Sequence, residues 1–448
     1  MRTQALTLVV LTALAAGCRL APPPSQSQML TDALPATTTI PSQWAVAVDT
    51  NTVADDWLET FDDPRLDLLV AEALENNPDL RAAAARVEAA RQVVVVVGSQ
   101  LLPKIGGRLG AAANRDEDHS DWGTPTTAYA GVSWEADIWG KLRAQKAAAE
   151  ASFESVAYEY AWAQESLAAT TAKAWFLATT TRQLLRLSAR AVDIYSELFE
   201  LVKVRRAAGK VSDLDVAEAG ASLNTAQAQL RTAKRAEAET RRALELLLGR
   251  YPSAEIAVAT DFPPVPPPVR AGLPLTLLER RPDLLAAQSP RLALLPSFGL
   301  RVEGGRLDDS VLSLLRLNPW LFRARIGISI PIYAGGELRA RVKIATAEQQ
   351  AAVEGYGAAV LIAFNEVENA LTNETLLAQT LHYREASVQD RSEAVRISRI
   401  QYKAGATDML SVLQIQADQI AAEGAVIRAR NAQLSNRIQL HLSLGGHW

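Results

Sequence analysis

The chain contains two stretches that are too long for the core of an ordinary globular domain. Residues 141–208 contain neither Gly nor Pro, and residues 337–404 contain no Pro and only Gly355 and Gly357. Because Gly and Pro are the residues that interrupt helices, each stretch predicts one continuous helix, about 100 Å long at 1.5 Å per residue. A glycine follows each stretch, at Gly209 and Gly405, and a second helical segment returns from it.

The two stretches belong to a tandem duplication of the chain. Segments that match at one constant spacing are Gly131-Val132-Ser133 with Gly327-Ile328-Ser329, Ala208-Gly209 with Ala404-Gly405, and Leu248-Gly249 with Leu444-Gly445. Upstream, Pro78-Asp79-Leu80 matches Pro282-Asp283-Leu284 at a wider spacing, whereas Leu101-Leu102-Pro103 matches Leu294-Leu295-Pro296 at a narrower one. The second half is therefore shorter in this region, by about three helical turns. Two copies of one unit organise the chain.

The first residues predict export and a lipid anchor. A positively charged start is followed by an apolar run that ends at Ala16, and then by Gly17 and Cys18, the only cysteine. This pattern is that of a secretory signal, too short to cross a bilayer as a helix. We expect acylation of Cys18; the alternative is a cysteine that is removed with the signal. Arg19 after the cysteine predicts sorting to the outer membrane, because the lipoproteins that this start resembles are not retained at the inner membrane.

Five segments follow from these features. We assign residues 1–17 to the signal peptide, 18–55 to an irregular lipid-anchored lead-in, 56–250 to the first repeat, 251–272 to a Pro-rich linker, and 273–448 to the second repeat. Beyond the signal, no uncharged apolar stretch approaches the length of a membrane-spanning helix. Strands are then the only elements able to span a membrane.

Strand-like segments precede each long helix. Apolar residues alternate with polar ones at Ala324, Ile326, Ile328 and Ile330, and at Ala128, Ala130, Val132 and Trp134. This alternation fits a half-buried sheet or the wall of a membrane barrel. Four strands per chain cannot close a barrel, whereas three chains would supply twelve. The signal and the anchor favour the barrel.

Composition and motifs exclude several classes of function. The net charge of −4 and pI near 5.8 give no basic surface for nucleic acid. The chain has four His and none of the HExxH, CxxC, GxSxG or phosphate-loop motifs, so no enzyme is predicted. Heptad spacing of apolar residues in the helices indicates coiled-coil packing. The alternative function is a non-conducting periplasmic scaffolding lipoprotein, which the strand-like segments disfavour.

Several segments in the same order resemble those of one family. They are 57–66 (WLETFDDPRL), 76–80 (NNPDL), 133–140 (SWEADIWG), 280–283 (RRPD), 331–336 (PIYAGG) and 444–448 (LGGHW). They resemble the outer membrane factor family, which is TolC-like, in its lipoprotein branch with OprM and NodT. The resemblance implies a mainly α fold with a small transmembrane β part: a trimeric twelve-stranded barrel in the outer membrane, continuous with a twelve-helix periplasmic coiled-coil tunnel.

The resemblance also implies partners. Such a homotrimer is a passive duct in outer-membrane lipid that receives small molecules from an inner-membrane pump, of the RND type, through a periplasmic adaptor. No cofactor is expected. Adaptor hairpins dock at the helix turns in the family, which carries over to Gly209, Val211, Ser212, Gly405 and Thr407. The alternative for these side chains is an ordinary capped turn, with Ser212 or Asp213 as the N-cap.

The resemblance places the narrow entrance of the duct just inside these turns. Tyr402 and Asp215 stand at the positions of a latch, in which a hydroxyl–carboxylate hydrogen bond could be broken by adaptor binding. Members of the family often carry acidic residues where this chain has Ser411 and Gln414, so an acidic ring is not predicted at those two positions. Asp408 is the remaining acidic candidate for the aperture, with helix capping as its alternative role.

Overall fold

The computed structural model describes residues 26–35, 37–46, 48, 53, 55–111, 114–115, 122–123, 126–138, 140–287, 298–308, 321–328, 333 and 335–448. The predicted signal peptide and Cys18 lie outside the described residues. The chain divides into two compact units, one that carries the described strands and one whose described elements are helices. Within the described part, no helix is both long and apolar enough to cross a bilayer.

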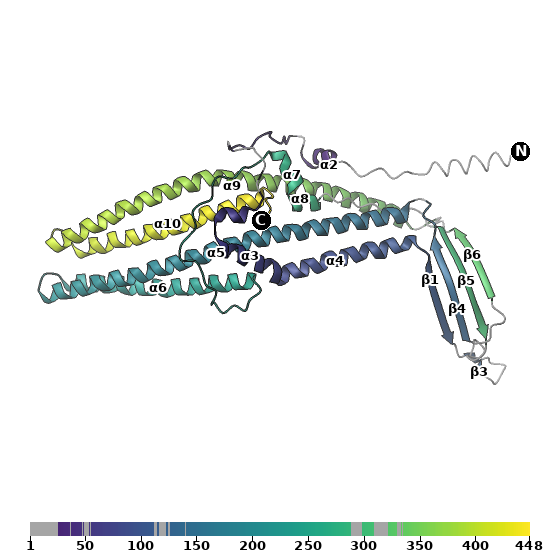
Figure 1. Cartoon of the computed structure of the whole chain (residues 1–448), viewed down its shortest axis with the longest axis horizontal. Coiled ribbons are helices and arrows are strands. Elements are labelled where there is room, and N and C mark those ends of the chain that lie inside the picture. Colours follow the sequence, from purple (N-terminus) through teal and green to yellow (C-terminus); the bar gives the residue numbers. More distant parts are fainter. Residues whose placement is uncertain are drawn as a thin grey trace. The chain divides into compact units, whose positions relative to one another are not determined.

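The predicted long helices and their returning partners are confirmed. Helix α5 spans Lys141–Ala207 and α9 spans Glu337–Ala404, while α6 (Asp213–Leu247) and α10 (Met409–Ser443) return from them (Figure 1). Helices α6 and α10 have 35 residues each. They start at positions related by the spacing of the duplication, as do α5 and α9. The duplication seen in the sequence is therefore a duplication of helical hairpins.

The first unit comprises the chain up to Ala36, Ala85–Ala157 and Ala286–Ala358. Its main sheet is antiparallel, in the order β1 (Lys104–Ala111), β4 (Thr126–Glu135), β5 (Phe298–Asp308) and β6 (Leu321–Ile328) (Figure 1). Strands β2 (Asn114–Arg115) and β3 (Trp122–Gly123) pair separately. Two strands of the main sheet thus precede each long helix, as predicted.

The register of this sheet separates apolar from polar positions. Val132 of β4 lies opposite Ile105 of β1 and Val302 of β5, whereas the next residue, Ser133, lies opposite Lys104 and Arg301. Directly opposed residues of neighbouring strands share a face of the sheet. One face therefore carries the apolar positions of several strands, which is the alternation expected of a wall between two different environments.

The lead-in contains a helix that the sequence did not predict. Residues Gln26–Ala33 form α2, where we expected irregular chain. A Cβ atom added to Gly357 of α9 would clash with the carbonyl oxygen of Ala33, and Ala33 is itself buried. Gly357 thus leaves the space in which the end of α2 packs against α9. The close packing of α2 therefore explains why this position of the second long stretch is a glycine.

We predict that Gly357→Val detaches α2 from α9. Overpacking of a close contact costs about 1–3 kcal/mol, so the detached state should become roughly fivefold to 150-fold more populated. Limited proteolysis followed by N-terminal sequencing should show faster cleavage within residues 26–35. Gly355→Val is the matched control, because nothing lies within 4 Å of its added Cβ. Equal cleavage of the two variants would contradict the proposed role of Gly357.

The second unit comprises Thr37–Ala84, Tyr158–Leu285 and Ala359–Trp448. Its short elements are η1 (Trp57–Phe61), α3 (Pro64–Asn76), η3 (Pro274–Thr276) and α7 (Leu277–Arg280), with α4 (Pro78–Gly98) and α8 (Pro282–Ala287) starting here. Helix α8 is described over 6 residues and α4 over 21 residues. The predicted deficit of the second repeat falls on positions up to 296, most of them outside the described part.

Equivalent contacts join the short helices to the returning helix of the same repeat. The Asn77 side-chain amide donates to the carbonyl oxygen of Leu247 at 3.0 Å, and the Arg281 guanidinium donates to that of Ser443 at 3.3 Å. These pairs are related by the spacings of the duplication. The Asn-Asn-Pro-Asp and Arg-Arg-Pro-Asp motifs therefore occupy the same place in the two repeats.

The Pro-rich linker is fixed by side chains from both repeats. Between Arg250 and Leu273 it forms no helix or strand. The buried Glu245 carboxylate accepts N–H hydrogen bonds from Ala254, Glu255 and Ile256 at 2.7–2.9 Å. Arg437 of α10 donates to the carbonyl oxygen of Pro266 at 2.6 Å. Both ends of this extended segment are thereby held against the helices.

Candidate functional site

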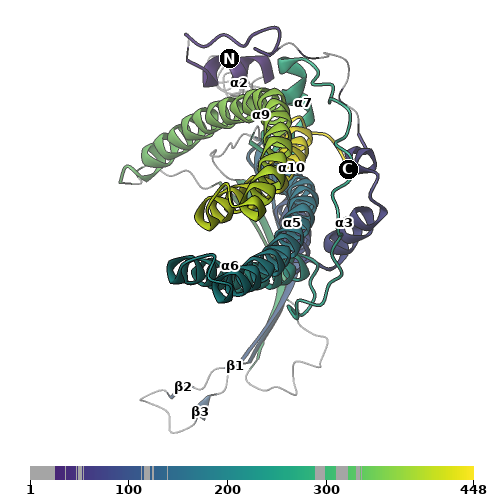
Figure 2. The same ribbon diagram turned by 90° about the vertical axis from the view of Figure 1, so that its left-hand side faces the viewer.

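The turns that end the two hairpins have the same backbone geometry. Figure 2 looks onto them, with α5 paired with α6 and α9 paired with α10. Gly209 and Gly405 have φ values of 68° and 79°, in the left-handed region that favours glycine. Lys210 N–H bonds to Arg205 O at 3.0 Å, and Ala406 N–H bonds to Gln401 O at 2.9 Å. These are Schellman closures of a helix end, so the need for glycine is confirmed.

The residues after each glycine cap the returning helix. Ser212 Oγ accepts from Asp215 N–H at 3.2 Å, and the Asp215 carboxylate accepts from Ser212 N–H at 2.8 Å, forming a capping box. In the second repeat, Asp408 accepts from Ser411 N–H at 2.7 Å. The hydrogen bonds from Ser411 lower the pKa of the Asp408 carboxyl. Capping, the alternative role of Ser212 and Asp408, is therefore present in the structure.

The turns expose most of the residues predicted for docking. Gly209, Ser212 and Gly405 are exposed, and Val211 and Thr407 are half-buried. Sequence reasoning missed two leucines beside them: Leu214 is 66% exposed and Leu410 is 52% exposed. They occupy equivalent positions in the two repeats, and this repetition was the signal that could have identified them. Each returning helix thus begins with an exposed leucine at the same position.

Tyr402 lies in a buried contact between the two hairpins. Arg205 of α5 donates to the Tyr402 carbonyl oxygen at 2.8 Å, and its guanidinium lies 4.4 Å from the centre of the Tyr402 ring. Burial raises the pKa of the Tyr402 hydroxyl, and the positive charge of Arg205 opposes that rise. Sequence reasoning missed Arg205, because a basic residue in the last turn of a helix is ordinary.

The predicted hydrogen bond between Tyr402 and Asp215 is not formed in this structure. The buried Tyr402 hydroxyl has no hydrogen-bond partner among the described residues, and Asp215 Oδ2 accepts instead from Ser212 Oγ at 2.6 Å. The local capping box occupies the carboxylate. The other predicted aperture residues, Ser411 and Gln414, are half-buried and exposed, respectively.

An apolar cluster below the turns holds the hairpins together. Its buried members include Ala191, Leu198 and Val202 of α5 and Met409 and Leu413 of α10. Ala191, Leu198 and Leu413 stand in apolar runs with heptad spacing in the sequence of these helices. The predicted apolar packing between these helices is therefore confirmed.

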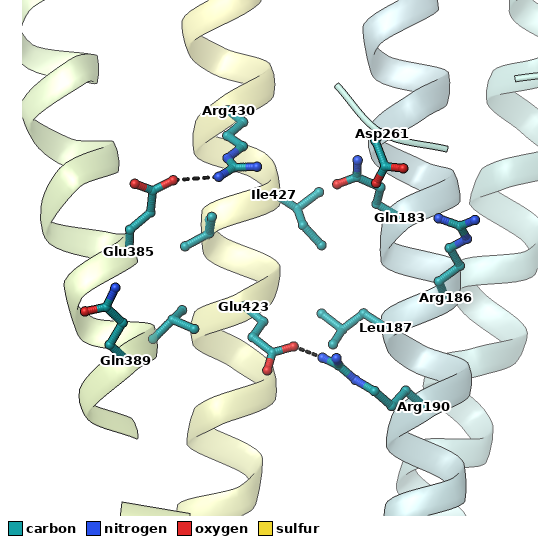
Figure 3. Close-up of a pocket in the computed structure, with 12 residues that line it drawn as sticks. Gln183, Arg186, Leu187, Arg190, Asp261, Glu385, Gln389, Glu423, Ile427 and Arg430 are labelled. Atoms are coloured by element: carbon teal, nitrogen blue, oxygen red, sulfur yellow. Dashed lines mark hydrogen bonds and ion pairs between the residues drawn. The ribbon is translucent and has the colours of Figure 1, made fainter. Parts of the chain in front are cut away.

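A cavity of about 650 Å³ lies further along the same hairpins (Figure 3). Leu187 and Ile427 give it an apolar part, while Arg190 pairs with Glu423, and Arg430 pairs with Glu385 at 2.8 Å. Among the described residues, no group of three His, Cys, Asp or Glu could hold a metal ion. The charged side chains of the cavity form two ion pairs, each between neighbouring helices.

Comparisons with known proteins agree with this architecture. A family model described as outer membrane efflux protein matches residues 69–250 and 273–446. The chain is 30% identical to the pyoverdine export outer membrane protein OpmQ of Pseudomonas aeruginosa, over 91% of each chain. It is 28% identical to the toluene efflux pump outer membrane protein TtgC of Pseudomonas putida, over 88% of this chain and 85% of the relative. A solved structure of the outer-membrane channel OprN is similar with a TM-score of 0.80 and 26% identity, covering 93% of this chain and 99% of that one.

Proposed function

Because the chain belongs to the outer membrane efflux protein family and is an outer-membrane efflux channel, we propose that it works as a passive homotrimeric duct. In this proposal it receives small molecules from an inner-membrane pump of the RND type through a periplasmic adaptor. The observation that carries the proposal is the repeated hairpin, whose two turns have the same geometry and the same exposed leucines. Nothing in this mechanism requires catalysis or a cofactor.

The sheet supports assembly with other copies. Strands β1 and β6 are the outer strands of its four-stranded order, so within the described sheet each has one side with unpaired backbone groups. Such edges are satisfied when another sheet continues them. Three copies joined in this way would give a closed wall of twelve strands, and its apolar face would be the one that contacts lipid.

The adaptor site in this proposal is the pair of turns. Gly209, Val211 and Ser212 in one turn, and Gly405 and Thr407 in the other, are the residues that we assign to docking, with Leu214 and Leu410 as added apolar contacts. Exposed leucines at equal positions in the repeats fit a partner that binds both hairpins alike. Asp408, Ser411 and Gln414 lie after the second turn and are assigned to the rim of the aperture.

Lipidation of Cys18 is the first test of the proposed localisation. A single thiol at the end of a signal sequence is the substrate of diacylation, and a second membrane attachment strengthens anchoring. Cys18→Ser should abolish incorporation of labelled palmitate in a Gram-negative host, while the helical hairpins still fold. Equal labelling of the variant and the natural chain would refute the anchor.

Arg205 should restrict the width of the entrance. A hydrogen bond to a charged donor contributes about 1.5–3 kcal/mol, and three symmetric copies would add their effects. Arg205→Ala should therefore make cells more sensitive to large antibiotics such as vancomycin, without lowering the amount of trimer. Tyr402→Phe is the control, since the Tyr402 hydroxyl has no partner among the described residues. A leak from Tyr402→Phe alone would instead favour the Tyr402–Asp215 hydrogen bond in the assembled duct.

Export itself can be tested in the native cell. Deleting the gene should raise the cellular accumulation of a fluorescent efflux substrate, and the natural chain supplied from a plasmid should reverse it. A variant with Leu214→Asp and Leu410→Asp should reach the outer membrane as trimer and yet fail to restore export. Full restoration by that variant would exclude the turns as the adaptor site. Unchanged accumulation after deletion would favour the scaffolding alternative.

A further inference from the structure

One row of the main sheet concentrates positive charge. The register places Ser133 of β4 opposite Lys104 of β1 and Arg301 of β5. Arg325 of β6 continues the row opposite Arg301. This row, which we call the cationic row, therefore holds three basic residues and no acidic one. It belongs to the polar face of the sheet, because successive residues of a strand alternate between faces and the neighbouring Val132 stands on the apolar face.

The cationic row lies at the end of the sheet that is joined to the long helices. Lys104 is the first residue of β1, which follows α4 and η2 (Figure 1). Ser133 is near the end of β4, which leads into α5, and Arg325 is near the end of β6, which leads into α9. A solute that passes from the helical part to the strands would meet this row first.

Two arginines of the row oppose each other directly. Opposed residues of neighbouring antiparallel strands have Cβ atoms about 4.5–5.5 Å apart, and like charges there destabilise a sheet. Arg301 and Arg325 occupy such a pair of positions. Charges on edge strands commonly prevent sheets from associating, which would account for Lys104 and Arg325. It does not account for Arg301, because β5 is paired on both sides.

The acidic residues of the polar face are too few to neutralise it. The strands place five basic and two acidic residues there, an excess of three positive charges: Lys104, Arg108, Arg301, Arg323 and Arg325 against Glu135 and Glu303. Both acidic residues lie outside the cationic row. Glu135 pairs with Lys141 of α5 at 3.4 Å, and the register places Glu303 opposite Arg323. An external anion is the remaining means of balancing the row.

We propose that the cationic row binds anions, so that the duct favours small molecules that carry a carboxylate or a phosphate group. The inference rests on the proposed trimeric duct and names its solute class. Three basic residues in each of three copies would give a ring of nine. Rings of Arg and Lys select anions in pores, and guanidinium groups bind carboxylate and phosphate oxygens in pairs. An anion bound at Arg301 and Arg325 offsets the repulsion between these two charges.

Ion selectivity of purified trimers in planar bilayers tests the ring. The reversal potential in a gradient of dilute potassium chloride gives the permeability ratio of chloride to potassium, which should exceed one for the natural chain. Arg301→Gln should lower this ratio about fivefold, roughly the effect of one unit charge at about 4 Å in water. The preference should weaken in about 1 M salt, where screening acts over about 3 Å.

Arg306→Gln is the matched control for selectivity. Arg306 belongs to the same strand, but it lies opposite Ala128 on the other face of the sheet, so its replacement should leave the ratio unchanged. A preference of the natural chain for potassium would overturn the proposal. An equal change in the Arg301 and Arg306 variants would overturn it as well, since the effect would then not depend on the cationic row.

Anion binding in detergent separates the site from the duct. Sodium citrate should raise the unfolding midpoint of the natural chain and of Arg306→Gln above that in sodium chloride of equal ionic strength, because a ligand stabilises the state that binds it. Arg301→Gln with Arg325→Gln should lose this difference. An equal rise in all three proteins would be a general salt effect and would overturn the site. If the natural trimer inserts without conducting, the duct fails, and the citrate measurement still decides the cationic row.

Discussion

Replacing Arg281 with alanine is expected to destabilise the folded chain by about 3 kcal/mol, the lower end of the cost of removing one partner from a buried ion pair. Arg281 is 2% exposed and pairs with Glu366 at 2.6 Å and with Asp283 at 2.7 Å, and its guanidinium lies 4.8 Å from the centre of the Trp162 ring. The two carboxylates are about one-third exposed, so water would partly compensate them, which is why the lower end applies.

The measurement is the thermal unfolding midpoint of the purified chain in detergent. Arg396→Ala is the control, because Arg396 also pairs with a carboxylate, that of Glu393, but both side chains are more than half exposed. Exposed pairs contribute little to stability. The Arg396→Ala variant should therefore have the same unfolding midpoint as the natural chain. Similar midpoints for the Arg281 and Arg396 variants would show that the buried cluster does not hold the repeats together.

Replacing His441 with phenylalanine is expected to make the chain more resistant to acid. Burial lowers the pKa of His441 to about 3, and the nearby Arg437 lowers it as well. The unfolded chain takes up this proton below pH 6.5 and the folded chain does not, so stability falls as the pH falls from about 6.5 toward 3. At about 1.4 kcal/mol per pKa unit, the loss over that window is on the order of 5 kcal/mol.

Phenylalanine preserves the packing of His441 without its titration. The His441 ring stacks on Trp57 at 5.7 Å, and its Nδ1 atom is buried without a hydrogen-bond partner among the described residues. The variant should match the natural chain at pH 7.5 and exceed its unfolding midpoint at pH 4. Parallel pH profiles of the two proteins would show that His441 does not control acid sensitivity.

Glu165 offers an internal check with the opposite sign. Burial raises the pKa of its carboxyl to about 7, with His447 lowering it and Asp55 raising it. The folded chain then holds this proton at a higher pH than the unfolded chain, so stability falls as the pH rises from about 4.5 to 7. Glu165→Gln should therefore gain stability at pH 8, where His441→Phe has no effect.

The long elements could be predicted from sequence because their signals are repeated and local. The near-absence of Gly and Pro over the two long stretches, and the matched glycines at 209 and 405, located α5, α9 and their turns. Strand alternation likewise located β4 and β6. Such patterns depend on backbone preferences that tertiary contacts do not reverse over this length.

The contacts of the site could not be predicted in the same way. The Asp215 carboxylate could accept a hydrogen bond from the Tyr402 hydroxyl or from the backbone of Ser212. It accepts from Ser212, which is the nearer residue in the chain. The role of Arg205 depends on Tyr402, which lies in the other repeat, and α2 is too short to show a period. The sequence showed that Gly357 interrupts a stretch otherwise almost free of glycine. The reason for this glycine, the close contact with Ala33, is seen only in the folded chain.

Single-channel recording of the purified trimer in planar lipid bilayers tests the central claim most directly. The natural chain should insert and produce discrete conductance steps, and Arg205→Ala should give larger or longer openings at the same trimer content. A trimer that inserts into the bilayer without any conductance step, in the natural form and in the Arg205 variant alike, would contradict the duct and leave the coiled-coil scaffold as the function.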